Sequence, residues 1–311
     1  MSLTKLLGIK YPLFQGAMAQ ISRYELVSAV SNAGGLGIIA SGAMDKETLR
    51  YQIQACKELT DKPFGVNLMM MMDNIAELVE VVIDEQVPVV TTGAGTPKEH
   101  VPKLKAAGIK VFPVIATVEQ AKKMEAIGVD GVVAEGTEAG GHIGESGTMA
   151  LVLQVAEAVS IPVIAAGGIV NGRGIVASFA LGAQGVQVGT RFLASEEAPI
   201  SLNYKQAIVA AQDDSTIVTG RTSRAPVRVI KNDMSKMYLE MEYHKVARDA
   251  LEKLTMGSLR KAVVDGDMVN GSIMAGQISG AVDSIKPVKE IVDQMFSEAE
   301  EVMKEMPKIF Y

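Results

Sequence analysis

The chain has 311 residues, of which 48% are hydrophobic and 21% charged, with 30 basic against 36 acidic residues and a formal net charge of −6. Such a composition excludes a disordered protein and is typical of one large domain, or of one domain with an insertion. The negative charge, the absence of Trp and the few other aromatic residues argue against nucleic-acid binding. No apolar run approaches the roughly 18 residues of a membrane span, and no secretory signal is present, so we expect a cytoplasmic protein without membrane association.

Between residues 11 and 192, short apolar runs alternate with amphipathic segments about every 25 residues, which is typical of repeated βα units. The predicted strands are 12–15, 36–40, 64–67, 89–92, 110–114, 131–135, 162–165 and 185–188. Predicted helices between them include 25–33, 46–59, 75–85, 118–127 and 149–159. Eight strands favour an α/β fold of the (β/α)8 TIM-barrel type over an open doubly wound sheet, because a closed barrel leaves no edge strand.

The βα rhythm breaks near Ser195, where the chain becomes more polar. We interpret residues 196–255 as a smaller helical insertion on the substrate side, covering the barrel mouth. Residues 1–195 and 256–311 would then form the barrel, with 258–264, 271–280 and a helix over 288–306 returning to it.

The segment 135–144 follows the sixth predicted strand and contains His142, one of only three histidines, among four glycines. Glycine lets a backbone take left-handed angles and approach a ligand closely. We interpret this segment as a catalytic loop, and a flexible turn with a surface histidine is the alternative. His100 and His244 lie among charged residues and are expected on solvated helix faces.

Active groups of TIM barrels lie at the carboxyl ends of the strands, and phosphate is commonly bound after strands seven and eight. Gly167 and Gly168 follow the seventh predicted strand, and Gly189 and Thr190 follow the eighth. Their backbone N–H groups would cradle a phosphate, although plain turns could carry the same residues. The chain has no acidic cluster for a metal, and its single cysteine, Cys56, excludes a cysteine cluster and is expected in a helix interior. A phosphate-bearing cofactor is therefore the natural occupant.

Several motifs together resemble one known family. They are residues 15–18 (QGAM), 33–37 (AGGLG), 63–67 (PFGVN), 138–142 (EAGGH), 165–169 (AAGGI) and 188–192 (VGTRF). The chain resembles the flavin-dependent family that contains nitronate monooxygenases (2-nitropropane dioxygenases) and enoyl-acyl-carrier-protein reductase II. Residues 90–95, 261–267 and 271–278 resemble the reductase branch.

This resemblance implies FMN across the barrel mouth, with its phosphate on Gly167, Gly168, Gly189 and Thr190. It also implies NADH as the electron donor, stimulation by a monovalent cation and an acyl carrier protein as partner, and it leaves a homodimer open. The remaining residues that we expect around the cofactor are Gly16, Ala17, Met18, Asn67, Thr92, Glu135, Gly140, Gly141, Met274, Gly276 and Gln277.

The implied reaction is NADH-driven reduction of a trans-2-enoyl thioester on the carrier, in the last reduction of a fatty-acid elongation cycle. His142 is our candidate for the proton donor, because histidine changes charge near neutral pH. In a nitronate monooxygenase, which uses oxygen, the same residue could act as a base, so His142 alone does not separate the two activities. A barrel that stores flavin without turnover and a flavin-free phosphosugar isomerase are further alternatives. The chain lacks a Gly-x-Gly-x-x-Gly fingerprint, so we expect NADH and thioester to use the same space in turn.

Two further features bear on the substrate. Four consecutive methionines, 69–72, could line an apolar acyl channel or pack in the core. The segment 214–236 has five basic residues, including Arg224 and Arg228, against two acidic ones. It could receive an acidic carrier protein or the phosphates of a pantetheine cofactor, or it could be a solvated helix face.

Overall fold

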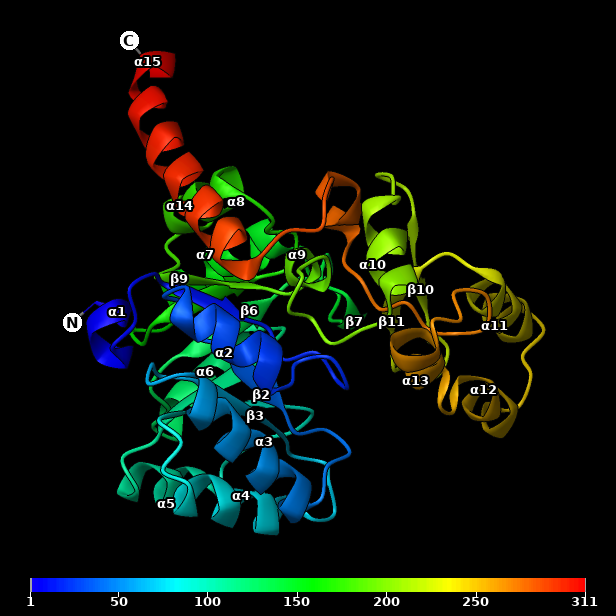
Figure 1. Cartoon of the computed structure of the whole chain (residues 1–311), viewed down its shortest axis with the longest axis horizontal. Coiled ribbons are helices and arrows are strands. Elements are labelled where there is room, and N and C mark those ends of the chain that lie inside the picture. Colours follow the sequence, from blue (N-terminus) through cyan, green and yellow to red (C-terminus); the bar gives the residue numbers. More distant parts are fainter. Residues whose placement is uncertain (1, 311) are drawn as a thin grey trace.

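The structure is a computed structural model that describes residues 2–310. Eight parallel strands form one sheet in the order β1-β9-β8-β6-β5-β4-β3-β2, and Figure 1 shows helices arranged around it. The sheet closes where Leu36, just before β2, bridges to Phe14 of β1. These strands are β1 (Leu13–Gln15), β2 (Ile38–Ala40), β3 (Gly65–Met69), β4 (Val89–Gly93), β5 (Lys110–Ile115), β6 (Val132–Glu135), β8 (Val163–Ala166) and β9 (Gly185–Val188). The predicted (β/α)8 barrel is confirmed, and every predicted strand is found with ends shifted by at most two residues.

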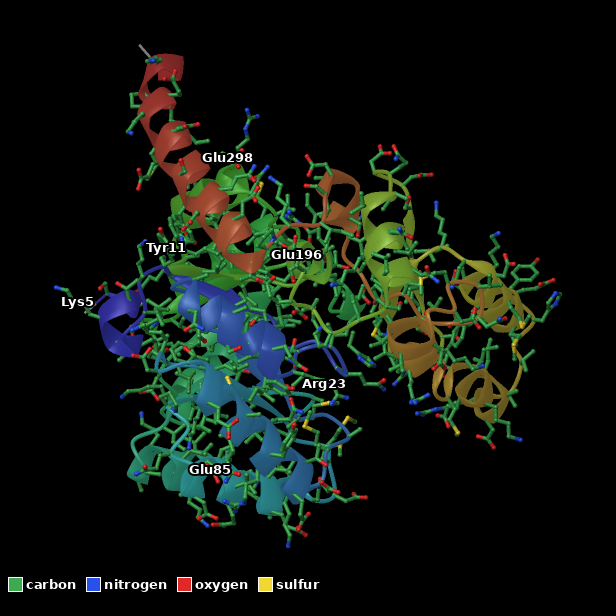
Figure 2. The ribbon with its side chains drawn as sticks, viewed as in Figure 1. Lys5, Tyr11, Arg23, Glu85, Glu196 and Glu298 are labelled. Atoms are coloured by element: carbon green, nitrogen blue, oxygen red, sulfur yellow. The ribbon has the colours of Figure 1, made fainter. Side chains whose placement is uncertain are left out.

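Helices surround the barrel and pack on the outward side chains of its strands. They are α2 (Tyr24–Asn32), α3 (Lys46–Leu59), α4 (Ile75–Asp84), α5 (Val101–Ala106), α6 (Val118–Ala126), α7 (Thr148–Ala158) and α8 (Gly172–Ala180). The ring is completed late in the chain by α14 (Val288–Glu305), which packs against both α8 and α2. Glu298 of α14 (Figure 2) accepts a hydrogen bond from the Gly172 N–H at 3.0 Å, which fixes α14 to the start of α8.

The barrel interior holds a core of its own. Inward side chains such as Phe14, Val89 and Phe112 form one cluster, and α1 (Leu3–Leu7) covers it at the amino end of the strands. The Phe14 and Phe112 rings meet edge to face, with centroids 5.5 Å apart. The inside of the barrel is therefore packed with side chains.

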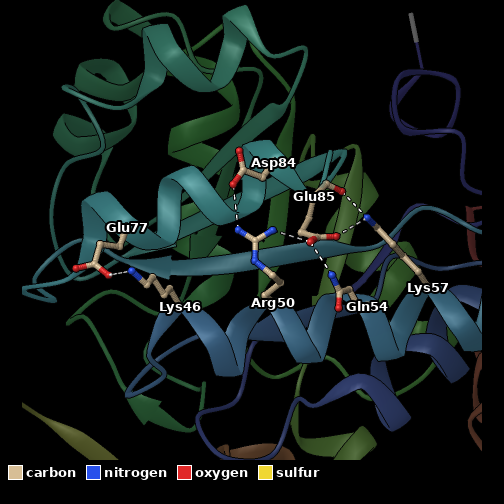
Figure 3. Close-up of polar contacts among 7 residues, drawn as sticks. All are labelled: Lys46, Arg50, Gln54, Lys57, Glu77, Asp84 and Glu85. Carbon is tan, nitrogen blue, oxygen red and sulfur yellow. Dashed lines mark hydrogen bonds and ion pairs between the residues drawn. The ribbon is translucent and has the colours of Figure 1, made fainter.

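A polar network ties α3 to α4 on the outer wall (Figure 3). The Glu85 side chain is 11% exposed. Its carboxylate accepts hydrogen bonds from Arg50 and Gln54 and forms an ion pair with Lys57. Burial alone would raise the pKa of Glu85, but these bonds outweigh it and lower the pKa. The network stabilises the wall of the barrel.

A smaller unit lies beside the barrel, at the right of Figure 1. It was predicted to be helical, and that is only partly right. The chain there also forms a hairpin, β10 (Thr216–Thr219) and β11 (Val227–Ile230), because both stretches are rich in β-branched residues. The other elements are α10 (Leu202–Val209), α11 (Asp233–Tyr243), α12 (Arg248–Thr255), α13 (Ser258–Arg260), a π-helical turn (Lys261–Asp265) and a 3-10 turn (Gln277–Ala281). Beyond α14, α15 (Pro307–Phe310) ends the described chain.

The chain leaves the barrel and returns to it along two adjacent segments. Ser195, after the short α9 (Thr190–Leu193), bridges to Lys286, and Glu197 accepts the Val288 N–H at the start of α14. Residues 256–282, which we had expected to return to the barrel, instead join the core of the smaller unit. Ala262, Val263, Ile273 and Val282 pack there with Tyr204 and Ile208. We therefore propose that this unit extends from about 196 to about 285, beyond the predicted end at 255.

Candidate active site

The floor of the barrel mouth is set by the alternation of side chains along each strand. Thr91 lies two residues beyond Val89, which belongs to the interior cluster, so its hydroxyl faces the mouth. Asn67 of the neighbouring strand donates a hydrogen bond from Nδ2 to Thr91 Oγ1 at 2.9 Å. Asn67 thus lies at the mouth, with its amide held by Thr91.

Thr92, which we expected beside the cofactor, is the next residue along the strand, and its side chain points to the opposite face from that of Thr91. Its side chain points to the same outer face as Val90, which packs under the helices. Within residues 2–310, its buried hydroxyl has no hydrogen-bond partner. Its side chain therefore does not reach the mouth, and Thr91 takes that place.

Gln187 is a polar residue of the mouth that the sequence analysis missed. Val186 and Val188 of β9 belong to the outer core, so Gln187 between them faces inward. A Cβ on Gly16 would lie 3.3 Å from Gln187 Cγ, so the two residues are neighbours. The alternation over 185–188 was the signal that could have identified this residue. Ala17, next to Gly16, packs on the interior cluster.

The histidine loop is held by the smaller unit. Gly141 and His142 form a two-residue strand, β7, paired antiparallel with β11, with His142 opposite Val227 and Gly141 opposite Arg228. Gly141 has φ 75°, a left-handed angle that suits glycine. The hairpin thus fixes the backbone of the candidate catalytic residue.

Arg228 does not belong to an exposed basic patch. Only 6% of its surface is exposed, and its guanidinium donates from Nε and Nη2 to the Thr137 carbonyl oxygen and from Nη1 to Thr216 Oγ1. Burial lowers the pKa of Arg228, but arginine stays protonated in proteins. The patch expected over 214–236 is further weakened by ion pairs: Lys231 with Asp214, Lys236 with Asp233 and Arg221 with Glu145.

The predicted phosphate residues Gly167 and Gly168 follow β8, the strand next to β6, and lie against the histidine loop. Gly167 and Gly168 have φ 98° and 73°. This left-handed backbone conformation, which other residues rarely adopt, sets the direction of both amides. Thr148 donates its hydroxyl to the Gly167 carbonyl oxygen at 3.0 Å, and its backbone N–H bonds to the Glu138 carboxylate. Glu138 therefore fastens the histidine loop to the glycine pair.

The Met274–Gln277 stretch forms another wall and joins these groups. The Gly276 N–H donates to Thr190 Oγ1, and the Gln277 N–H donates to the Glu138 carbonyl oxygen, each at 2.9 Å. A Cβ on Gly140 would lie 2.6 Å from the backbone of Ala275. Glycine is therefore required at 140 by the close approach of two backbones.

The start of this stretch is anchored from within the smaller unit. Tyr204, fully buried, donates its hydroxyl to the Met274 carbonyl oxygen at 2.9 Å. A Cβ on Gly141 would lie 3.7 Å from Met274 Sδ, so the methionine side chain covers the histidine loop.

The space beside these residues fits a cofactor phosphate. A Cβ on Gly189 would meet only Met18 Sδ, at 3.8 Å, so this position faces open space. No side chain caps α9, which begins at Thr190, and the Phe192 N–H bonds to the Gly189 carbonyl oxygen. Together with the turned amides of Gly167 and Gly168, this arrangement matches the chemistry of a phosphate cradle. The fold thus brings together residues that lie far apart in the sequence, namely Gly140, Gly167, Thr190, Gly276 and Gln277.

Two titratable groups share one cavity of about 890 Å³ next to the mouth, Glu135 and His142. Glu135 faces inward at the end of β6, and burial raises its pKa to about 7. His142 is exposed to the cavity, and partial burial of its ring lowers its pKa. Glu135 can therefore exchange protons near neutral pH, whereas His142 loses its proton at a lower pH than an ordinary histidine.

The other residues singled out from the sequence lie outside this cavity. His100 precedes α5 and His244 follows α11. Met71 is 69% exposed, whereas Met70 packs on the main core. Cys56 is buried in α3, and burial raises its pKa to about 12.

Neither a metal site nor a membrane-spanning helix is found among residues 2–310. No cluster of three or more His, Cys, Asp or Glu there is arranged to hold a metal ion. None of the helices in that range combines the length and apolarity of a membrane crossing.

Comparison with known proteins places this arrangement in context. The family model for nitronate monooxygenase matches residues 1–79 and 73–298. FabK from Thermotoga maritima superposes with a TM-score of 0.97 and is 46% identical, over 99% of each chain. A 5-hydroxy-7a-methyl-1-oxo-octahydro-1H-indene-4-carboxyl-CoA dehydrogenase from Rhodococcus jostii is 32% identical, over 96% of this chain and 95% of that one. A probable nitronate monooxygenase from Staphylococcus saprophyticus is 34% identical, over 96% and 98% of the two chains.

Proposed function

Because the chain belongs to the nitronate monooxygenase family of flavin-dependent enzymes, we propose that it is an FMN-dependent reductase of enoyl thioesters with NADH as donor. The observation that carries this proposal is the likeness to FabK, at 46% identity over 99% of both chains. Motifs 90–95, 261–267 and 271–278 resemble the enoyl-acyl-carrier-protein reductase II branch, which agrees with it. The carboxyl-CoA dehydrogenase from Rhodococcus jostii is named for a thioester as well.

The residues of the mouth fit FMN. Gly167, Gly168, Gly189 and Thr190 would hold the phosphate, and the amides of Asn67 and Gln187 would meet polar edges of the ring. Bound FMN would supply hydride transfer from NADH to the substrate.

His142 would complete the reduction. Hydride addition at the β-carbon leaves negative charge on the α-carbon and the carbonyl oxygen of the thioester, and a proton must be delivered there. His142 lines the cavity next to the mouth, and its lowered pKa makes its imidazolium a stronger acid than an ordinary histidine. The pairing of β7 with β11 holds its backbone in place while the proton moves.

The test is anaerobic NADH oxidation by the purified protein, with and without a crotonyl thioester. Stoichiometric NADH loss that requires the thioester supports the reductase. NADH loss at the same rate with and without the thioester contradicts it.

A nitronate monooxygenase is the second candidate, favoured by the family model and by the Staphylococcus saprophyticus relative. In that activity His142 would take a proton from the nitroalkane, from the same position. Oxygen uptake on addition of a nitronate in air, without thioester-dependent NADH loss, would support this second function.

A further inference from the structure

The cavity that contains Glu135 and His142 continues away from the mouth to the outer surface of the barrel. Its far end is lined by Ala126, the last residue of α6, and its rim by Lys98 and Lys123. Since a helix rises about 1.5 Å per residue, the part of α6 that lines the cavity, from Gln120 to Ala126, extends roughly 9 Å along the wall. A reacting double bond needs much less room than this.

We propose that this groove receives the phosphopantetheine arm of the thioester substrate, and that Lys98 and Lys123 meet its phosphate. The inference rests on the proposed function and adds the route by which the substrate reaches His142. An arm that enters here would lay its thioester end next to His142 and leave its phosphate at the surface.

The charges of the groove suit this ligand. Its lining has two lysines at the outer rim, and its one carboxylate, Glu135, lies at the inner end. Lys123 is 66% exposed and pairs only with Glu119 of its own helix, and Lys98 makes no ion pair within residues 2–310. A phosphate at the rim would therefore meet positive charge that the rest of the described chain does not neutralise fully.

The lining of the groove between its two ends is mostly apolar, including Ile115 and Met124. A pantetheine arm has apolar carbons between its amides and a phosphate at its end. The apolar lining of the groove matches the carbons, and the lysines at the rim match the phosphate. The basic segment 214–236 offers no such path, because its Arg228 is buried and three of its other cations are paired.

Two neighbouring lysines provide the first test. Lys123→Glu changes the rim, whereas Lys122→Glu makes the same charge change on the same helix outside the groove. Each variant is assayed with crotonyl thioesters of N-acetylcysteamine, coenzyme A and the carrier protein. We expect Lys123→Glu to raise the KM for the two phosphate-bearing thioesters roughly five-fold, with no change for N-acetylcysteamine and little effect of Lys122→Glu.

A steric pair tests the groove itself. Ala126 and Ala106 are the exposed last residues of α6 and α5, and only Ala126 lines the groove. Ala126→Trp should lower kcat/KM about ten-fold for the long thioesters and spare the short one, whereas Ala106→Trp should spare all three.

The outcomes separate this inference from the proposed function. No turnover of any thioester by the unaltered protein contradicts the function itself. If the unaltered protein turns over all three thioesters, and the groove variants affect all three equally or affect none, the groove does not bind the phosphopantetheine arm. An effect of Lys123→Glu on the carrier thioester alone also overturns it, because the lysine would then contact the carrier surface. Effects on both phosphate-bearing thioesters support binding of the arm in the groove. The kcat/KM values of the unaltered protein for the coenzyme A and carrier-protein thioesters then show which of the two is preferred.

Discussion

The guanidinium of Arg228 donates two hydrogen bonds to the carbonyl oxygen of Thr137, from Nε at 3.1 Å and from Nη2 at 3.0 Å. Arg228 belongs to β11 of the smaller unit, and Thr137 lies in the loop that carries His142. A carbonyl of the candidate catalytic loop is thus fixed by a buried cation from another part of the chain. The position of His142 therefore depends on the smaller unit as well as on the barrel.

We predict that Arg228→Met lowers kcat about ten-fold or more, because a loosened loop misplaces the proton donor. The variant should also lose about 1–3 kcal/mol of unfolding free energy, since the Thr137 carbonyl loses its donors. Stopped-flow reduction of the thioester and urea unfolding measure the two effects.

Arg221→Met is the matched control, because Arg221 lies in the turn of the same hairpin but is exposed and makes a long ion pair with Glu145. It should change neither quantity beyond experimental scatter. Equal losses in the two variants would contradict a special role for Arg228.

The phosphate cradle leads to a second prediction, for Gly189→Ala. The added Cβ would meet only Met18 Sδ, at 3.8 Å, so the fold should tolerate it. It would also occupy the space that we assign to the phosphate, and the protein should lose most of its FMN while the Tm of the apoprotein stays unchanged. Gly93→Ala is the control, because nothing lies within 4 Å of a Cβ there. Full FMN content in Gly189→Ala would refute the assigned cradle.

Local pattern in the sequence identified the barrel, because each strand is a short apolar run, and it placed the candidate site residues at the strand ends. Helix 46–59 and strand 185–188 have the predicted bounds, since caps and apolar runs are local signals. The choice of Thr92 over Thr91 was wrong by one residue, because the phase of a strand depends on what packs on each face. No local signal gives the partner of Arg228 or the pairing of β7 with β11, because both join distant parts of the chain.

Glu135 gives a third prediction, on stability. Its folded pKa is raised to about 7, against an ordinary value of 4.5, so the unfolded chain binds fewer protons between these values. Stability should therefore fall as pH rises from 4.5 to about 7 and level off above, by roughly 3 kcal/mol at most. Glu135→Gln should remove this dependence and unfold at higher urea than the parent at pH 8. Parallel pH profiles for the two proteins would contradict the raised pKa.

The sign of the pH dependence of catalysis provides the last prediction. Partial burial lowers the pKa of His142 below its usual 6.5, so the protonated form is lost as pH rises through that lowered value. If His142 donates the proton in thioester reduction, kcat/KM should fall with rising pH from below pH 6.5. If His142 instead takes a proton from a nitroalkane, kcat/KM should rise over the same range, since only the neutral ring is a base. His142→Gln should abolish either slope and lower kcat by about 10²-fold or more, whereas His100→Gln should leave the profile unchanged. A slope that survives in His142→Gln would assign the titration to another group, for which Glu135 in the same cavity is the first candidate.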